Sequence, residues 1–201
     1  MEKVISIVGA GGKTTLVHKL AREYHRSGKG VLVTTTTHMY VEADTDLSCD
    51  FFALRDKIIK DGYCMAGQKI SEQKISEQSK MCGLPYDLLD KLIKGMPQAL
   101  DYVIIEADGA KHHSLKYPAA DEPVIYPGTT DVIIVLGTWE KGRSCKDVVF
   151  RYELMQKELG TAEDAVVDDS IIDTLRQVYV RKLRDSGFEA RVSCVFANER
   201  G

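Results

Sequence analysis

The stretch SIVGAGGKTTL, residues Ser6 to Leu16, decides the predicted fold, because it joins an apolar run to a glycine-rich turn and then to an amphipathic segment. It ends in Gly12-Lys13-Thr14-Thr15, as phosphate-binding loops of the type G-x-x-x-x-G-K-[ST] do. The leading glycine of that pattern would fall on Ile7, and the first glycine present is Gly9. The stretch is therefore either a shortened phosphate loop or a glycine-rich turn without a ligand.

The residue types of this loop favour the first alternative. Glycines let backbone N–H groups close around phosphate oxygens, and the start of a helix adds favourable charge. We expect Lys13 to reach the terminal phosphates, Thr14 to ligate Mg²⁺ and Thr15 to lie beside it. The residues expected to surround the phosphate are Gly9, Ala10, Gly11 and Gly12. The short form G-x-x-G-K-T-T resembles the ATP loop of the Mur and folylpolyglutamate ligases.

Composition describes an ordinary globular chain of 201 residues, with 44% hydrophobic residues and a net charge of −3. This charge gives no basic footprint for nucleic acid and no polybasic patch for a membrane. The longest apolar runs, such as residues 132–136, are far too short to span a bilayer. Five scattered cysteines without a C-x-x-C pair indicate reduced thiols. We therefore expect a cytoplasmic protein with neither a nucleic-acid nor a membrane partner.

Apolar runs alternate with amphipathic segments, which is typical of an α/β fold. We expect a P-loop NTPase-like three-layer sandwich with a mainly parallel sheet. The runs expected to form strands are 4–8, 31–36, 103–107, 132–136 and 192–196, and the expected helices are 14–26, 84–96, 149–159 and 170–186. The simplest organisation is a single domain over residues 1–201 with an inserted variable subregion at about 49–97. That subregion holds the tandem repeat KISEQ-KISEQ, residues 69–78.

Two further segments have the composition of companions to the glycine loop. In VTTTTHMY, residues 33–40, Thr35 or Thr37 can reach Mg²⁺ or a γ-phosphate from the end of a strand, and His38 either contacts a ligand or only begins a loop. In YVIIEADGAK, residues 102–111, an apolar run ends in acidic residues, which is the Walker B form. We expect Asp108 to hold a metal ion or water, and Glu106 to be a second acidic partner or general base. Because threonine also favours strands in general, the first pattern has a purely structural alternative.

The loop after the acidic residues gathers cationic and imidazole side chains. Lys111, His112, His113 and Lys116 follow Asp108 within eight residues. Loops in this position of an α/β sheet often carry function. We expect them to serve an anionic second substrate or a mobile switch segment, with Lys111 among the ligand-binding residues. Exposed histidines without a role are the alternative for His112 and His113.

Taken together, these motifs resemble the YqeC family. The resemblance rests on VGAGGKTT, VTTTTHM, IEADGAK with the later EPVIYP, and VIIVLG, and it extends from Val4 to about Asn198. It implies a P-loop NTPase-like fold and an accessory role in maturing or inserting the selenium-containing cofactor of molybdenum hydroxylases. Beyond the glycine loop, the positions implied by the family motifs are Thr35 to His38, Glu106, Asp108, Gly109, Lys111, Lys116, Glu122-Pro123 and Arg151.

The sequence leaves several functions open. The first is an enzyme that binds ATP or GTP with Mg²⁺ and hydrolyses it to drive a cofactor-maturation step, with a molybdenum hydroxylase or its cofactor as partner. The second is a nucleotide-gated carrier without significant turnover. A Mur-ligase-like ATP-dependent ligase and a small-molecule kinase, with Lys111 and His112 near the acceptor, are further alternatives. Asn198 lies where relatives with a guanine-reading motif carry their asparagine, but Glu199-Arg200 follow it.

Overall fold

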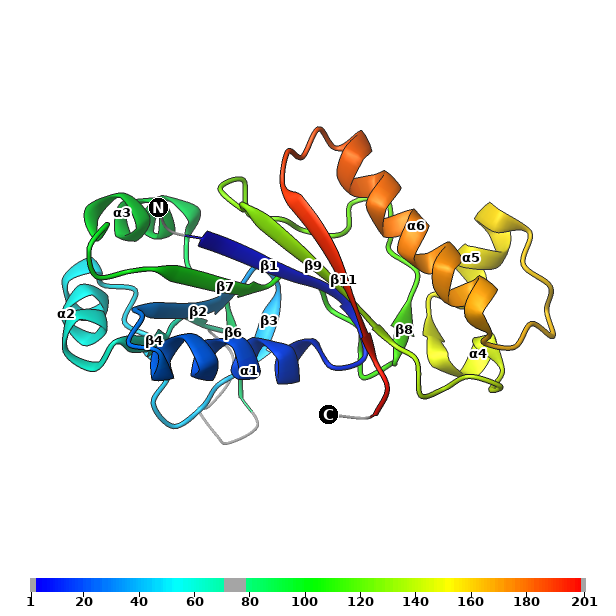
Figure 1. Ribbon diagram of the computed structural model, residues 1–201, viewed down its shortest axis with the longest axis horizontal. Coiled ribbons are helices and arrows are strands. Elements are labelled where there is room, and N and C mark those ends of the chain that lie inside the picture. Colours follow the sequence, from blue (N-terminus) through cyan, green and yellow to red (C-terminus); the bar gives the residue numbers. More distant parts are fainter. Residues whose placement is uncertain (1–2, 71–78, 200–201) are drawn as a thin grey trace. The chain divides into compact units, whose positions relative to one another are not determined.

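The structure is a computed structural model that describes residues 3–70 and 79–199 (Figure 1). Apart from Lys69 and Ile70, the KISEQ repeat lies outside the described residues. The chain divides into two compact units, which are described one after the other. Unit 1 consists of Met1–Ser6, Leu16–Ala107 and Ile125–Asp131, and unit 2 of Ile7–Thr15, Asp108–Val124 and Val132–Gly201.

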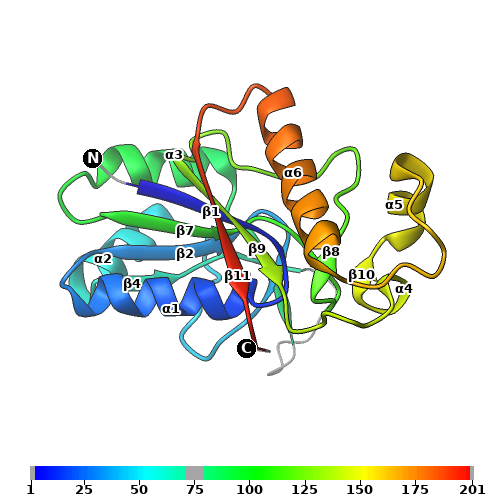
Figure 2. The same ribbon diagram turned by 45° about the vertical axis from the view of Figure 1, so that its right-hand side comes forward.

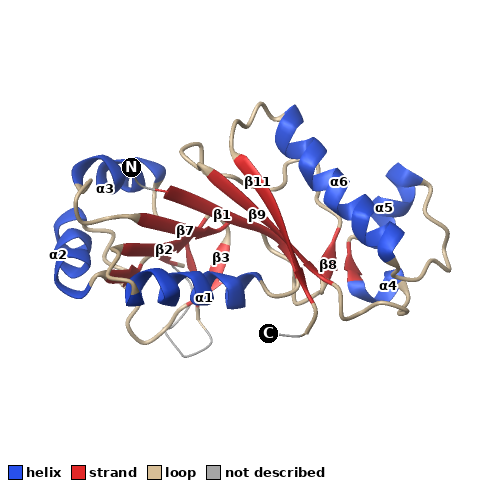
Figure 3. Cartoon of the chain, in the orientation of Figure 1, coloured by secondary structure: helices blue, strands red, loops and turns tan. Residues whose placement is uncertain are grey.

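A six-stranded sheet has the strand order β11-β9-β1-β7-β2-β4. Within unit 1, β2 pairs in parallel with β7 and with β4, and all five residues of β2 are buried. Near-continuous apolar runs of this kind are typical of parallel strands that are covered on both faces. The expected α/β class with a mainly parallel sheet is confirmed (Figure 3). The strands are β1 (Lys3–Ala10), β2 (Val31–Thr35), β4 (Tyr63–Met65), β7 (Tyr102–Glu106), β9 (Asp131–Gly137) and β11 (Arg191–Ala197).

Unit 1 also holds most of helix α1 (Lys13–Arg26), all of α2 (Phe51–Asp61) and α3 (Tyr86–Gly95), and a small antiparallel sheet. That sheet has the order β3-β6-β5, from His38–Tyr40, Lys80–Cys82 and Gln68–Lys69. The segment 49–97, for which the sequence pattern was least informative, therefore contributes α2, α3 and strands of both sheets. Its strand β4 is an edge strand of the six-stranded sheet, next to β2.

Unit 2 contains a two-stranded parallel sheet of β8 (Leu115–Lys116) and β10 (Val149–Phe150), together with α4 (Cys145–Val148), α5 (Tyr152–Leu159) and α6 (Asp169–Asp185) (Figure 2). The expectation of one helix over 149–159 is wrong for its first three residues. Val149 and Phe150 pair with β8 instead, and Arg151 has a φ of 64°, which lies in the left-handed region. A right-handed helix cannot pass through such a residue, so α5 begins at Tyr152.

None of the helices in the described parts of the chain is long and apolar enough to cross a membrane.

The carboxyl end of β2 is held in place by residues 83 and 84. The backbone N–H of Leu84 donates to Oγ1 of the buried Thr34 at 3.2 Å. A Cβ atom on Gly83 would lie only 1.6 Å from the carbonyl oxygen of Thr35. Thr34 therefore has a structural role, and Gly83 is required because any side chain would push this segment away from the strand end.

We predict that Gly83→Ala lowers the free energy of unfolding by about 2 kcal/mol or more, because the new methyl group meets backbone that cannot move aside. Denaturant unfolding of the variant and of the native protein measures the difference. Gly109→Ala is the matched control, since a Cβ there meets nothing within 4 Å, and we expect a change of less than about 0.5 kcal/mol. Equal stability of the two variants would contradict the prediction.

Candidate functional site

The glycine loop lies between β1, which ends at Ala10, and α1, which begins at Lys13. Gly9, Gly11 and Gly12 have φ values of 94°, 75° and 102°. A Cβ atom on Gly9 would lie 2.1 Å from the carbonyl oxygen of Val135, and one on Gly11 would lie 2.5 Å from that of Ser114. Both the backbone angles and the close approach require glycine here. Gly9 is therefore the residue that opens the turn.

Lys13 is folded back over this loop. Its side chain is buried, and Nζ donates a hydrogen bond of 2.9 Å to the carbonyl oxygen of Gly9. Thr14 and Thr15, in the first turn of α1, are exposed, and that turn contains no acidic residue. The N–H groups at a helix start and an ammonium group on the same loop attract an oxyanion. The arrangement can therefore hold a phosphate group, with Lys13 exchanging the Gly9 carbonyl for a phosphate oxygen.

Asp108 connects the loop to the rest of unit 2. Its carboxylate is buried and accepts hydrogen bonds from the Gly9 backbone N–H at 3.3 Å, from the Tyr179 hydroxyl at 2.8 Å and from Nζ of Lys116. Burial, followed by the charge of Asp108 and the hydrogen bond to it, raises the pKa of Tyr179 well above its usual value. Tyr179 therefore stays protonated and remains a donor. The carboxylate predicted to hold a metal or water thus has both of its oxygens engaged by the protein itself.

Lys116 lies at the centre of a series of ion pairs between charged side chains. Its side chain is fully buried, and Nζ pairs with Asp108 and, at 2.8 Å, with Glu122. Glu122 also pairs with the guanidinium of Arg151, whose second nitrogen lies 3.1 Å from Oε1. Burial alone would raise the pKa of Glu122, but the hydrogen bonds from Arg151 and Lys116 lower it to about 2. The chain Gly9–Asp108–Lys116–Glu122–Arg151 is continuous and lies within unit 2.

In unit 1, the structure brings together Thr35, Thr37 and Glu106. The hydroxyl of Thr35 donates to the backbone carbonyl of Glu106 at 2.6 Å and accepts from the backbone N–H of Thr37 at 3.0 Å. A longer contact of 3.4 Å joins it to the Thr37 hydroxyl, so its hydrogen bonds stay within the strand ends. The Glu106 side chain is largely buried, and His38 is exposed in β3. The Thr35 contacts therefore fix the backbone at the carboxyl ends of β2 and β7.

The loop after Asp108 converges on a residue that the sequence reasoning missed. Nζ of Lys111 lies 5.3 Å, Nζ of Lys116 5.9 Å and Cζ of Arg151 4.7 Å from the centroid of the Phe150 ring. The His113 ring stacks on the same ring at 5.5 Å. Tyr179 was also missed. In the sequence, Tyr179 is indistinguishable from a core residue, because it lies on the apolar face of a helix. No local sequence pattern around Phe150 predicts that cationic side chains contact its ring.

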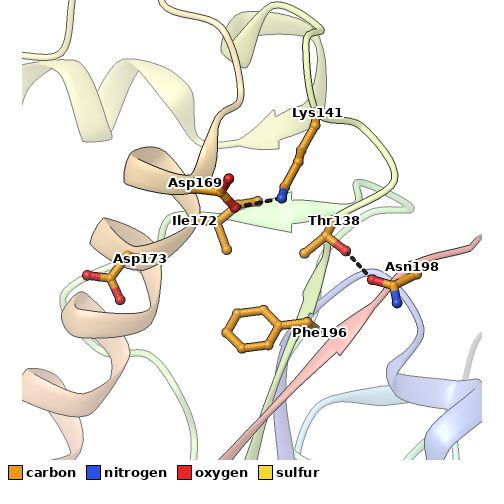
Figure 4. Close-up of a pocket in the computed structure, with 7 residues that line it drawn as sticks. All are labelled: Thr138, Lys141, Asp169, Ile172, Asp173, Phe196 and Asn198. Atoms are coloured by element: carbon orange, nitrogen blue, oxygen red, sulfur yellow. Dashed lines mark hydrogen bonds and ion pairs between the residues drawn. The ribbon is translucent and has the colours of Figure 1, made fainter.

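A pocket of about 380 Å³ lies in unit 2 at the ends of β9 and β11 (Figure 4). The Thr138 hydroxyl lies 2.9 Å from both the backbone carbonyl oxygen of Ala197 and Oδ1 of Asn198, which share its single hydrogen. A Cβ atom on Gly12 would lie 3.7 Å from the Cβ of Ala197, so the glycine loop adjoins the end of β11. The pocket is lined by Thr138, Lys141, Asp169, Ile172, Asp173, Phe196 and Asn198.

Among residues 3–70 and 79–199, no group of three or more histidine, cysteine, aspartate or glutamate side chains is placed to hold a metal ion. A divalent cation at this loop would therefore take most of its ligands from elsewhere, above all from phosphate oxygens and water.

The strand, glycine loop and helix together define an α/β protein in which β1 leads through a glycine-rich turn into α1. The family model described as YqeC protein matches residues 5–153, and the chain belongs to the YqeC family. It is 32% identical over 173 residues to Uncharacterized protein YqeC of Escherichia coli (strain K12), a match that covers 82% of this chain and 63% of that protein. The chain thus spans less than two thirds of the length of this relative. The resemblance expected from the motifs is confirmed.

Among solved structures, the chain is similar to the structure of pNOB8 ParA bound to nonspecific DNA. The sequences are 14% identical, and the match covers 96% of this chain and 79% of that one with a TM-score of 0.36. A TM-score this low supports no inference about fold or function.

The lowered pKa of Glu122 gives a prediction for stability in acid. Because the pKa falls from 4.5 to about 2 on folding, this ionised carboxylate stabilises the protein above about pH 4.5, and the contribution disappears as the pH falls toward 2. Glu122→Gln lacks the contribution at every pH. We expect its deficit in unfolding free energy to shrink by roughly 2 kcal/mol between pH 6 and pH 3, measured by urea unfolding. A deficit that is the same at both pH values would contradict this prediction.

Proposed function

We propose that this protein binds a nucleoside triphosphate at the glycine loop and hydrolyses it with Mg²⁺. One observation carries the proposal: three glycines with positive φ lead directly into a helix whose first residue, Lys13, holds its ammonium group against the loop at 2.9 Å. A simple turn does not need a lysine buried in this way. Membership of the YqeC family supports the proposal, because the matched residues 5–153 include the whole loop.

The residues present fit a bound magnesium nucleotide. Backbone N–H groups of residues 9–15 would hold the phosphates, Lys13 would bind the terminal phosphates, and the Thr14 hydroxyl is exposed at the first turn of α1 to meet Mg²⁺. The cation would neutralise phosphate charge during transfer. Asp108 fixes the loop through the Gly9 N–H. Asp108 as a metal or water ligand and Glu106 as a second carboxylate are further parts of the proposal. Thr15, Thr35, Thr37 and His38 remain proposed ligand contacts.

The pocket of Figure 4 fits the base of this nucleotide. The end of β11, from which Phe196 and Asn198 line the pocket, adjoins the loop at Gly12. The pocket offers the ring of Phe196 for stacking and the amide of Asn198, of which Thr138 engages only the oxygen. Two of its seven lining residues are aspartates and one is a lysine, a balance that disfavours phosphate and suits an uncharged ring. In this proposal the phosphates therefore lie at the glycine loop and the base at the end of β11.

Family membership extends the proposal to a biological role. We propose that nucleotide turnover assists the maturation or insertion of a selenium-containing molybdenum cofactor in a hydroxylase, within the cytoplasm. A nucleotide-gated carrier is the second candidate, and one observation favours it: both oxygens of the Asp108 carboxylate already accept hydrogen bonds from the protein, from Lys116 on Oδ1 and from Gly9 and Tyr179 on Oδ2. Turnover measured with and without a partner hydroxylase separates the two candidates, because a carrier stays near zero until the partner is added.

We predict that Lys13→Ala weakens ATP or GTP binding about 100-fold, because a charge-assisted contact to phosphate is lost. Titration calorimetry with the magnesium nucleotides measures the effect. Lys19→Ala is the control, since it removes an exposed lysine from the same helix, and it should bind as the native protein does. Native affinity in Lys13→Ala, with the fold intact by circular dichroism, would remove the site assignment.

For the pocket, we predict that Phe196→Ala weakens ATP or GTP binding about tenfold through the loss of stacking, and leaves the binding of inorganic tripolyphosphate unchanged. Val195→Ala is the matched control, because neighbouring residues of a strand point to opposite faces and both side chains are partly exposed. A parallel loss of tripolyphosphate binding would show that Phe196 supports the loop and does not contact the base.

A further inference from the structure

A group of cationic and imidazole side chains surrounds Phe150 in unit 2, outside the glycine loop. We use the name Phe150 cluster for Lys111, His113, Phe150 and Arg151. The cations of Lys111 and Arg151 lie 5.3 and 4.7 Å from the ring centroid, and the His113 ring stacks on it at 5.5 Å. Phe150 is fixed in turn by the pairing of β10 with β8. The ring thus gathers positive side chains from two segments that are about 40 residues apart in the chain.

The charges of the cluster are only partly neutralised by the protein. Glu122 accepts from Arg151 and from Lys116, and Asp108 accepts from Lys116. The exposed Lys111 has no ion pair with any carboxylate in the described parts of the chain. Two other acidic side chains act on Arg151: the buried Asp108, and Asp121, which is exposed to solvent. An ammonium group held against a ring without a carboxylate partner is open to an external anion.

The two segments that carry the Phe150 cluster contain residues in a backbone conformation that their residue types rarely adopt. Lys111, His112 and Arg151 have φ values of 45°, 66° and 64°. Among the described residues only one other residue that is not glycine, Cys49, has a positive φ. Backbone strain of this kind persists where the surrounding structure enforces it, and it concentrates at ligand sites. Three of the four such residues fall on the two segments that meet at Phe150.

The cluster is also connected to the glycine loop. Arg151 pairs with Glu122, Glu122 with Lys116, Lys116 with Asp108, and Asp108 accepts from the Gly9 N–H. An anion that binds Arg151 in place of Glu122 changes the ion pairing at the Arg151 end of this series of contacts. The glycine loop lies at the other end of the series. A site in this position suits a second reactant better than an unrelated surface contact.

We propose that the Phe150 cluster is a second anion site, which binds the phosphate or carboxylate group of a small second ligand through Lys111 and Arg151. This site goes beyond the proposed nucleotide function and does not depend on it. The guanidinium of Arg151 already presents two nitrogens to one carboxylate, Glu122, which is the fork geometry that recognises carboxylate and phosphate alike. His113 borders the site from the other segment.

The test uses inorganic phosphate and succinate as probes, titrated by calorimetry and by amide NMR shifts into Lys13→Ala protein, in which the glycine loop no longer competes for phosphate. We expect one saturable site for at least one probe, with shifts at Lys111, His113 and Phe150. The probe that binds more tightly identifies the phosphate or the carboxylate source. If neither probe binds in this background, the proposal is overturned, whereas the nucleotide proposal is judged separately by the binding of nucleotides to the native protein.

Two further variants in the same background locate the site. Lys111→Gly removes the charge and relieves the positive φ, so we expect a melting temperature equal to or above that of the parent together with about tenfold weaker probe binding. Phe150→Leu removes no charge but loses the ring that gathers the cations, and it should weaken binding by a similar factor. Lys146→Ala, an exposed lysine on α4, is the control and should bind as its parent does. Unchanged probe affinity in Lys111→Gly would overturn the proposal.

Discussion

The ion pairs of Lys116 are the constraint on which unit 2 depends. This side chain is fully buried, yet it is paired with two carboxylates, Asp108 and Glu122, and donates to the carbonyl oxygen of Gly109 at 2.6 Å. Taking an ammonium ion out of water costs several kcal/mol, and only well-placed partners offset that cost. Removing either carboxylate would leave this buried ammonium group with one ion-pair partner in place of two. The positions of Asp108 and Glu122 are therefore tied to one another.

This constraint reaches the glycine loop through Asp108. Lys116 holds Oδ1 of that carboxylate and Tyr179 holds Oδ2, so Oδ2 also accepts from the Gly9 N–H in a fixed place. The loop is thus supported by an acidic residue that follows a strand, and not only by its own glycines. A carboxylate that is shared in this way also sets a condition for catalysis, since a metal ion at Asp108 would compete with Lys116 and Tyr179 for its oxygens.

Much of the framework could be predicted from the sequence because it depends on local patterns. The strands β1, β2, β7, β9 and β11 were found to within two residues at each end, because runs of apolar and β-branched residues mark strands. This holds even for β11, which is largely exposed. The glycine loop was recognisable because its chemistry is contained in seven consecutive residues. The helix expected over 149–159 failed at its start, because Val149 and Phe150 pair with β8, which lies more than thirty residues earlier in the chain. No local pattern contains that partner.

The sequence by itself determined the class of fold, the YqeC family and the place of the glycine loop, because periodicity and a compact motif are written in neighbouring residues. Only the tertiary structure decided which charges meet. Lys116 is one of several cations in a polar loop, and nothing in its neighbours shows that it becomes the buried partner of Asp108 and Glu122. The gathering of Lys111, His113 and Arg151 on Phe150 was equally invisible. Such contacts depend on distances between segments far apart in the chain, and those distances are set by packing.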